Sequence, residues 1–163
     1  MVTERAEDYL KIIRKIIEKK GYAQVKDVSR ELELSSPSVT VMFRKLTNQG
    51  YINYEKYGGV TLTPEGERIA KCTIEKHGII KDLLLMLGIN ETIANQDACK
   101  IEHVLAPETF DVLAKLVEFV GETNNRLYWI ESFRHFYATG QYIDFSPSAK
   151  DTCPINGKET KSN

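Results

Sequence analysis

SSPSVTVMFRKLTNQGYINYEKYGGVTLT, the stretch at residues 35–63, decides the fold of this chain. Its opening serines offer side-chain oxygens for a helix N-cap, and Pro37 suits the first helical position, where a missing N–H is tolerated. Gly50 is the expected end of that helix. Two short runs rich in Tyr, Ile, Val and Thr lie on either side of Gly58 and Gly59, which is a strong hairpin signal. The stretch therefore predicts a helix followed by a two-stranded hairpin.

Two more helices are expected upstream of this stretch. Apolar residues recur at helical spacing from Glu4 to Lys20, and Gly21 follows as a stop. A second amphipathic segment, VKDVSRELEL at residues 25–34, is followed by a short turn. Three helices and a hairpin make a winged helix-turn-helix, whose third helix reads the major groove in proteins that bind DNA. We assign residues 1–63 to such a DNA-binding domain.

The remainder of the chain predicts helices only. Thr63 and Pro64 have the N-cap and first-position signals of a long connecting helix that runs to Gly88. Further helices are expected at residues 90–105, 107–120 and 127–137. The predicted fold is mainly α with a small β wing, and its second, all-helical domain for metal binding and dimerisation spans residues 64–139. Residues 140–163 are rich in Pro, Ser, Lys and Asn, which is typical of a flexible tail.

Composition favours an ordinary soluble protein. Net charge is −1 overall, but residues 1–60 hold 11 Lys and Arg against 8 Asp and Glu, whereas the rest of the chain holds 11 against 15. Such an asymmetry permits a basic DNA-binding domain joined to an acidic metal or partner domain. No apolar run reaches the roughly 18 residues of a membrane helix, and the charged N-terminus lacks a signal-peptide core. Three widely spaced cysteines argue against a disulfide framework. We expect a cytoplasmic protein with no membrane partner.

The third helix carries the candidate DNA contacts. Exposed residues near the start of a recognition helix face base edges, while basic residues and the wing hold phosphates. The candidates are Ser36, Ser38, Thr40 and Val41 toward base edges, Pro37 at the helix start, and Arg44, Lys45 and Lys56 toward phosphates. A winged helix that contacts protein instead is the alternative, and it is a minority use of this motif.

Cys99, Glu102 and His103 in DACKIEHVL form a candidate metal face, because spacings of three and four place their side chains on one side of a helix. His77 on the connecting helix and Asp8 on the first helix could complete the ligand set. One alternative is a winged-helix regulator without metal control, in which these are core and capping residues. Another is an enzyme with a Cys nucleophile and a His base, which the lack of a Gly-rich turn or oxyanion-hole signal disfavours.

Five motifs occur along the chain in an order typical of one protein family. They are AEDYLKII, SSPSVTVMFRKL, GYINYEKYGGVTLTPEG, KHGIIKDLLLMLG and ACKIEHVLAPETFDVL. Together they resemble the diphtheria-toxin-repressor family of iron- and manganese-dependent regulators, over about residues 4–125. The resemblance implies a homodimer, a divalent metal between the first helix and the second domain, and repression of metal-uptake genes from a double-stranded DNA operator. The residues themselves leave repression or activation open.

Matched residue by residue, the resemblance implies one principal metal site. Its ligands are Asp8, Cys99, Glu102 and His103, with His77 as an auxiliary. Cys99 is the choice of iron-type members and Asp8 that of manganese-type members, so Fe(II) and Mn(II) both remain candidates.

A second, ancillary site of the family is expected to be lost. Lys11 stands where manganese-type members have a carboxylate, Lys81 stands where iron-type members have Glu, and Asn95 stands where they have His. Ammonium groups at two of these positions disfavour a second divalent ion. Apolar stripes predict the homodimer interface, and their residues are Leu83, Leu84, Leu87, Val112, Leu116 and Phe119.

Overall fold

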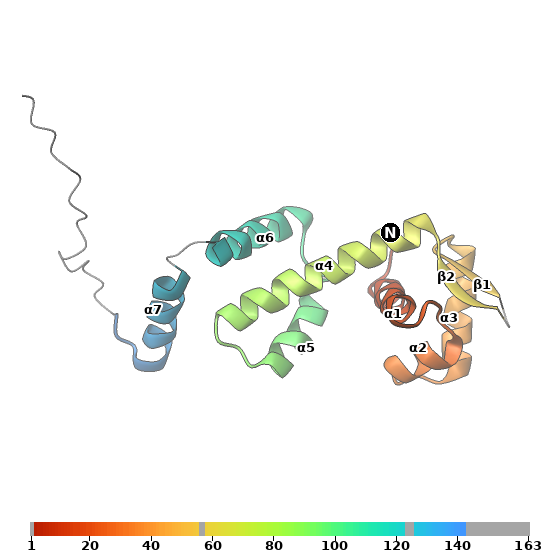
Figure 1. Cartoon of the computed structure of the whole chain (residues 1–163), viewed down its shortest axis with the longest axis horizontal. Helices are drawn as coiled ribbons and strands as arrows, with labels where there is room; N and C mark the ends of the chain where they lie inside the picture. Colours follow the sequence, from red (N-terminus) through yellow and green to blue (C-terminus); the bar gives the residue numbers. More distant parts are fainter. Residues whose placement is uncertain (1, 56–57, 123–125, 143–163) are drawn as a thin grey trace, which may run out of the picture.

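The computed structural model describes residues 2–55, 58–122 and 126–142 (Figure 1). Its elements in chain order are α1 (Glu4–Lys20), α2 (Val25–Glu31), α3 (Ser36–Asn48), β1 (Ile52–Glu55), β2 (Gly59–Leu62), α4 (Pro64–Met86), α5 (Glu91–Ile101), α6 (Pro107–Glu122) and α7 (Arg126–Thr139). The prediction of a mainly helical fold with a small antiparallel wing is confirmed. Most of the predicted tail, from residue 143 onward, lies outside the described residues. Within the described ranges, no helix combines the length and apolarity needed to cross a membrane.

The helix ends follow the capping signals of the sequence. Thr3, Ser35 and Thr63 each accept a hydrogen bond from a backbone N–H in the first turn of α1, α3 and α4 respectively. These bonds satisfy donors that a helix leaves unpaired at its N-terminus. Gly21 ends α1 with φ of 84°, in the left-handed region that glycine adopts without steric cost. Local sequence signals therefore place the starts of α1, α3 and α4 and the end of α1.

The core of the N-terminal part lies between α1, α3 and the wing. Its fully buried large side chains include Tyr9, Leu10 and Ile13 of α1, Val39, Phe43 and Leu46 of α3, and Ile52 and Val60 of the strands. The ring of Phe43 meets Tyr9 and Tyr54 edge to face, with ring centroids 6.4 Å and 5.3 Å apart. Such contacts add to the free energy of burial and have defined geometry. The first contact links α1 to α3, and the second links α3 to β1.

α4 is shared by both halves of the chain. Its first turns contribute Ile69 and Ala70 to the N-terminal core, and Gly66 lies so near the Tyr51 carbonyl that a Cβ there would overlap it. Its later turns pack against α5 and α6. Figure 1 shows α4 as one continuous helix between the two parts. The DNA-binding domain is therefore joined to the second domain by a helix.

α5 is shorter than the sequence predicted. It ends at Ile101, whereas apolar spacing predicted a helix as far as Leu105, and that boundary is wrong. The chain must reverse before α6 begins at Pro107, and the Val104 N–H donates to the Ile101 carbonyl, three residues back, at 3.1 Å. The helices expected at residues 64–88, 107–120 and 127–137 are present with ends shifted by at most two residues.

Candidate nucleic-acid interface and metal centre

α3 presents most of the predicted DNA contacts on its exposed side. Ser36, Pro37, Ser38, Val41, Arg44 and Lys45 are exposed, and Thr40 is half-buried. Val41 is 66% exposed, although α3 buries four other apolar side chains. An exposed valine on a recognition helix suits contact with a thymine methyl group. Lys56, the predicted phosphate contact of the wing, lies outside the described residues.

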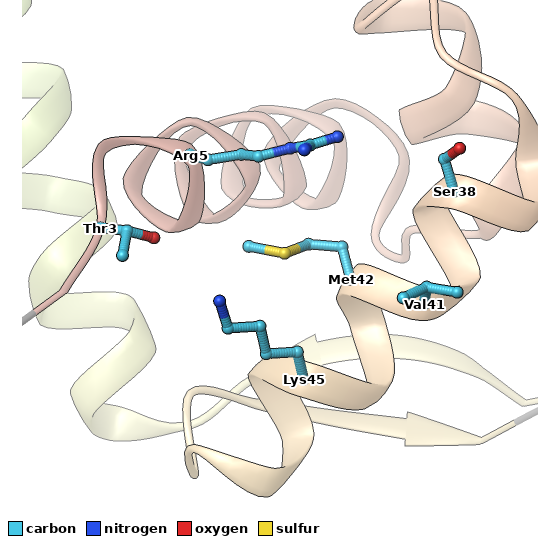
Figure 2. Close-up of a pocket in the computed structure, with 6 residues that line it drawn as sticks. All are labelled: Thr3, Arg5, Ser38, Val41, Met42 and Lys45. Atoms are coloured by element: carbon cyan, nitrogen blue, oxygen red, sulfur yellow. The ribbon is translucent and has the colours of Figure 1, made fainter.

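A cavity of about 390 Å³ lies between the start of α1 and α3 (Figure 2). Its lining residues are Thr3, Arg5, Ser38, Val41, Met42 and Lys45. Two basic side chains, Arg5 and Lys45, reach this hollow from different helices beside the predicted base-reading residues. Sequence analysis missed Arg5, because its position opposite α3 depends on the packing of α1 rather than on any local motif.

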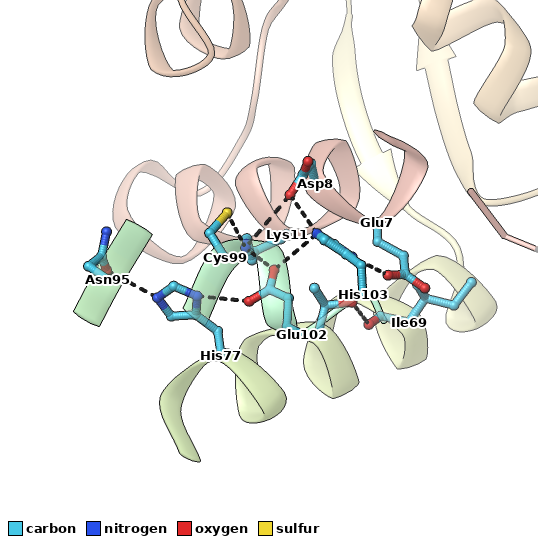
Figure 3. Close-up of polar contacts among 10 residues, drawn as sticks. Glu7, Asp8, Lys11, Ile69, His77, Asn95, Cys99, Glu102 and His103 are labelled. Carbon is cyan, nitrogen blue, oxygen red and sulfur yellow. Dashed lines mark hydrogen bonds and ion pairs between the residues drawn. The ribbon is translucent and has the colours of Figure 1, made fainter. Parts of the chain in front are cut away.

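Three of the predicted metal ligands come together at one point (Figure 3). One oxygen each of Asp8 and Glu102 and one ring nitrogen of His103 all lie within 4.8 Å of one another. Ligands on opposite sides of an ion with bonds of about 2.0–2.2 Å are about 4.0–4.4 Å apart. Two carboxylates and an imidazole also suit Fe(II) and Mn(II) chemically. The residues present therefore fit a divalent metal.

The three donors are brought together by two separate parts of the chain. Asp8 lies in the first half of α1, which packs against α4. Glu102 is the C-cap of α5, and His103 lies in the turn beyond it. The side chain of Glu102 has no exposed surface and that of His103 is 5% exposed, whereas that of Asp8 is 36% exposed. The site is therefore buried on the second-domain side and open on the side of α1.

Cys99 does not join this group of three. It lies one turn earlier on α5, and the end of the helix interrupts the single face that was predicted for Cys99, Glu102 and His103. Its sulfur is 3.7 Å from the Lys11 ammonium. The ligand role of Cys99 stays a prediction, supported by its position beside the same cluster.

Lys11 is the residue of this site whose burial the sequence did not suggest. It is only 5% exposed, and its ammonium forms an ion pair with Glu102 across the two domains. It also lies 3.7 Å from an Asp8 oxygen. Burial alone would lower the pKa of Lys11, but the hydrogen bond to Glu102 and the negative charges of Glu102, Cys99 and Asp8 raise it above its ordinary value.

His77 lies on the other side of the Glu102 carboxylate. Its Nδ1 is 2.7 Å from Glu102 Oε2, and its Nε2 is 3.1 Å from the Asn95 side-chain oxygen. Burial would raise the pKa of Glu102, but the bonds to His77 and Lys11 outweigh it and hold that pKa below its ordinary range. His77 was expected to be an auxiliary residue of the metal site, and it thus lies there as a partner of the Glu102 carboxylate. Lys81 instead pairs with Glu91 at 2.9 Å.

Glu7 is a further neighbour that sequence analysis missed. Its Oε2 is 2.6 Å from His103 Nδ1, while the other ring nitrogen, Nε2, lies 3.2 Å from Asp8 Oδ1. An acidic residue in the first turn of a helix is common for electrostatic reasons alone, so the pattern offered no signal for this contact.

Comparisons with known proteins identify the family to which both domains are similar. Residues 1–60 match the model of the iron dependent repressor, N-terminal DNA binding domain, and residues 63–125 match its metal binding and dimerisation domain. The HTH-type transcriptional regulator MntR of Lysinibacillus sphaericus is 39% identical over 122 residues, which are 75% of this chain and 88% of that protein.

Two solved structures extend the likeness to three dimensions. The metal-dependent transcriptional regulator MtsR has a TM-score of 0.65 at 32% identity, over 72% of this chain and 55% of that one. A manganese-dependent transcriptional repressor in complex with manganese has a TM-score of 0.64 at 26% identity, over 70% and 53% respectively. The chain therefore spans about half the length of these two solved proteins.

The Lys11–Glu102 pair leads to a prediction about stability. In metal-free protein at pH 7, Lys11→Ala is expected to lower the free energy of unfolding by about 3–5 kcal/mol, because a buried carboxylate loses its counter-charge. Since the folded-state pKa of Glu102 is lowered, its contribution is present above its ordinary value of 4.5 and is lost as pH falls through the folded value. The penalty of the substitution should shrink over the same range, because a protonated Glu102 needs no ammonium.

Urea unfolding followed by circular dichroism between pH 7 and pH 3, with chelator present, measures both effects. Lys100→Ala on exposed α5 surface is the matched control and should change stability by less than about 1 kcal/mol. A Lys11→Ala penalty that is small, or equal at every pH, would contradict the assignment.

Proposed function

This chain belongs to the iron-dependent repressor family, and from that premise we propose how its metal centre controls its DNA-binding domain. As a member of the family it is a metal-dependent transcriptional repressor whose metal is divalent iron or manganese. The observation that carries the proposal is that Asp8 of α1 lies beside Glu102 and His103 of the second domain. A ligand set drawn from both domains can hold them in one arrangement.

The coupling starts from the electrostatics of the two carboxylates. Asp8 and Glu102 approach each other from different domains, and the single Lys11 ammonium between them leaves one of their two negative charges unmatched. Asp8 and Glu102 would both hold a divalent metal, which would supply the missing positive charge. Asp8 then holds α1 against the second domain, and the neighbouring Tyr9 holds Phe43 of α3 in turn. Metal binding therefore positions the recognition helix.

The energetic requirement on this coupling is modest. A metal that binds the DNA-competent arrangement ten times more tightly than the other contributes about 1.4 kcal/mol, within the usual range of allosteric coupling. In a dimer, the favoured arrangement is the one in which two recognition helices fit successive major grooves, about 34–36 Å apart.

We assign one regulatory ion per protomer. Asp8, Glu102 and His103 are its proposed ligands, Cys99 is the fourth candidate on the adjacent turn of α5, and His77 supports Glu102 as an auxiliary residue. The Lys11 ammonium lies among Asp8, Cys99 and Glu102 and adds a positive charge beside the ligands of the proposed ion. Like charge at that position disfavours another divalent ion.

The proposed DNA surface combines the start of α1 with α3. Ser36, Ser38, Thr40 and Val41 are assigned to base edges, and Arg44, Lys45 and Arg5 to phosphates. Arg5 extends the predicted set, because its side chain borders the same hollow as Lys45.

The family consists of DNA-binding regulators rather than enzymes. We propose the cytoplasm as its compartment and Cys99 and His103 as ligands instead of a catalytic pair.

Metal-dependent DNA binding is the first test. Fluorescence anisotropy with promoter DNA from metal-transport genes should show that the protein binds DNA in the presence of Mn(II) or Fe(II). Its affinity for DNA should fall at least tenfold when chelator is added. Arg5→Ala should weaken binding to all sequences and reduce the salt slope by about 1, because a phosphate contact releases counterions without reading bases. Lys100→Ala, far from α3 on α5, is the control. Equal DNA affinity with and without chelator would rule out the metal switch.

The single-ion assignment makes a second prediction. Metal analysis of protein saturated with Mn(II) and then dialysed should give one ion per chain, and Lys11→Glu should raise the number toward two, because a carboxylate replaces an ammonium among the ligands. Lys100→Glu makes the same change of charge on exposed surface and should leave the number at one. Two tightly held ions in the unsubstituted protein would contradict the assignment.

The homodimer is proposed to form through α6. Val112, Leu116 and Phe119 recur at helical spacing and are 67%, 37% and 68% exposed, so α6 presents an apolar stripe. Leu83, Leu84 and Leu87 of the predicted stripe are half-buried. The alternative is that Trp129 and Phe133 of α7 cover the apolar stripe within one chain. Phe133 is itself exposed, and the side chain of Trp129 lies outside the described residues.

Sedimentation at micromolar concentration should give a dimer, and Val112→Asp should shift it toward monomer, because a charge is then buried in an apolar interface. Glu118→Lys, which also changes the charge of an exposed residue on α6 but lies outside the three- and four-residue spacing of this stripe, should have a smaller effect. A monomeric unsubstituted protein, with and without metal, would overturn this interface.

A further inference from the structure

The ring of His103 has a carboxylate beside each of its nitrogens (Figure 3). Nδ1 is 2.6 Å from Glu7 Oε2, whereas Nε2 is 3.2 Å from Asp8 Oδ1 and 3.4 Å from Glu102 Oε1. The ring is almost fully buried. The three carboxylates therefore have different relations to it: two border the proposed metal position at Nε2, and the third lies on the opposite edge.

These positions matter because only one nitrogen of a neutral imidazole carries a proton. The nitrogen that bears the proton is a donor, and the other has the lone pair that a metal needs. A carboxylate close to Nδ1 favours the tautomer in which Nδ1–H donates to it. Nε2, the nitrogen beside Asp8 and Glu102, then has the free lone pair. A hydrogen bond of this kind also increases the basicity of a metal-binding histidine.

We infer that Glu7 is a positioning residue of the metal centre, which selects the ligand tautomer of His103 and holds its ring toward Asp8 and Glu102. The inference rests on the proposed function and deepens it, because it assigns a role to a residue outside the set of metal ligands. Glu7 acts through His103 and does not itself bind the metal.

The place of Glu7 in the chain gives this bond a second consequence. Glu7 and Asp8 are consecutive residues of α1, and both reach His103, which belongs to the second domain. The Glu7 bond attaches α1 to the second domain at the very ring that completes the metal site. The same contact that prepares His103 as a ligand therefore docks the helix that carries Asp8.

Mn(II) titration by calorimetry on the full chain tests the role in binding. Glu7→Ala should weaken Mn(II) affinity by about 10- to 100-fold, as is usual when the hydrogen-bond partner of a metal-binding His is removed. Glu7→Gln keeps an oxygen that can accept from Nδ1–H and should bind Mn(II) within about threefold of the unsubstituted protein. Glu4→Ala, an exposed acidic residue in the same first turn of α1, is the control and should have no effect.

NMR of imidazole ¹⁵N signals in Zn(II)-loaded protein supplies a readout independent of DNA binding. The His103 signals should show a proton on Nδ1 and a coordinated Nε2, and in Glu7→Ala the Nδ1 proton should exchange rapidly with water. A Glu7→Ala affinity within twofold of the unsubstituted value, an equal loss in Glu7→Gln and Glu7→Ala, or metal bound through Nδ1 would each overturn the inference.

The same experiments separate this inference from the proposed function. If the unsubstituted protein binds Mn(II) and His103→Ala abolishes that binding, the metal centre stands, and only the Glu7 results decide the positioning role. If His103→Ala binds Mn(II) as well as the unsubstituted protein, the assigned centre itself is wrong, and the role of Glu7 is rejected with it.

Discussion

The buried carboxylate of Glu102 is the constraint on which the rest of the structure depends. Its side chain is fully removed from solvent, and an unmatched charge in such a place costs several kcal/mol. The chain surrounds it with the Lys11 ammonium from α1, the His77 ring from α4 and the His103 ring from the turn after α5. Stabilising this one charge therefore draws three segments, distant in sequence, to a common point.

An ammonium and a divalent metal stabilise that carboxylate in different ways. Lys11 supplies charge and hydrogen-bond donors, but it has no empty coordination position for the lone pair of His103 Nε2. Its contact with Asp8 is also longer, at 3.7 Å, than a ligand bond would be. The lysine balances the charge of Glu102 in the arrangement described, whereas only a metal could bind Asp8, Glu102 and His103 at once. This difference leaves a role for metal in a site that already contains a cation.

Local sequence patterns predicted the helices and strands of this protein. They could not predict contacts between residues that lie far apart in the chain. Capping residues and apolar spacing located the helices and the wing. Spacings of three and four from Cys99 predicted a metal face with Glu102 and His103, and the latter two lie beside Asp8. The burial of Lys11 was not predicted, because lysine is rarely buried without a partner and its partner Glu102 lies 91 residues away. The contacts of Glu7 and Arg5 are equally non-local. α5 ends early because the chain reverses direction before α6, and the spacing of apolar residues does not predict such a reversal.

The continuity of α4 also bears on how such a regulator and its operator can change over evolution. A helix of 23 residues at about 1.5 Å per residue is a stiff strut of about 34 Å, with the winged helix at one end and the packing surface of α5 and α6 along the other. One base pair inserted between half-sites turns one of them by about 34–36° around the duplex, since a turn contains about 10–10.5 base pairs. A hinged linker would absorb that rotation, but a strut transmits it as strain. Operator spacing in this lineage should therefore drift far more slowly than the bases within each half-site.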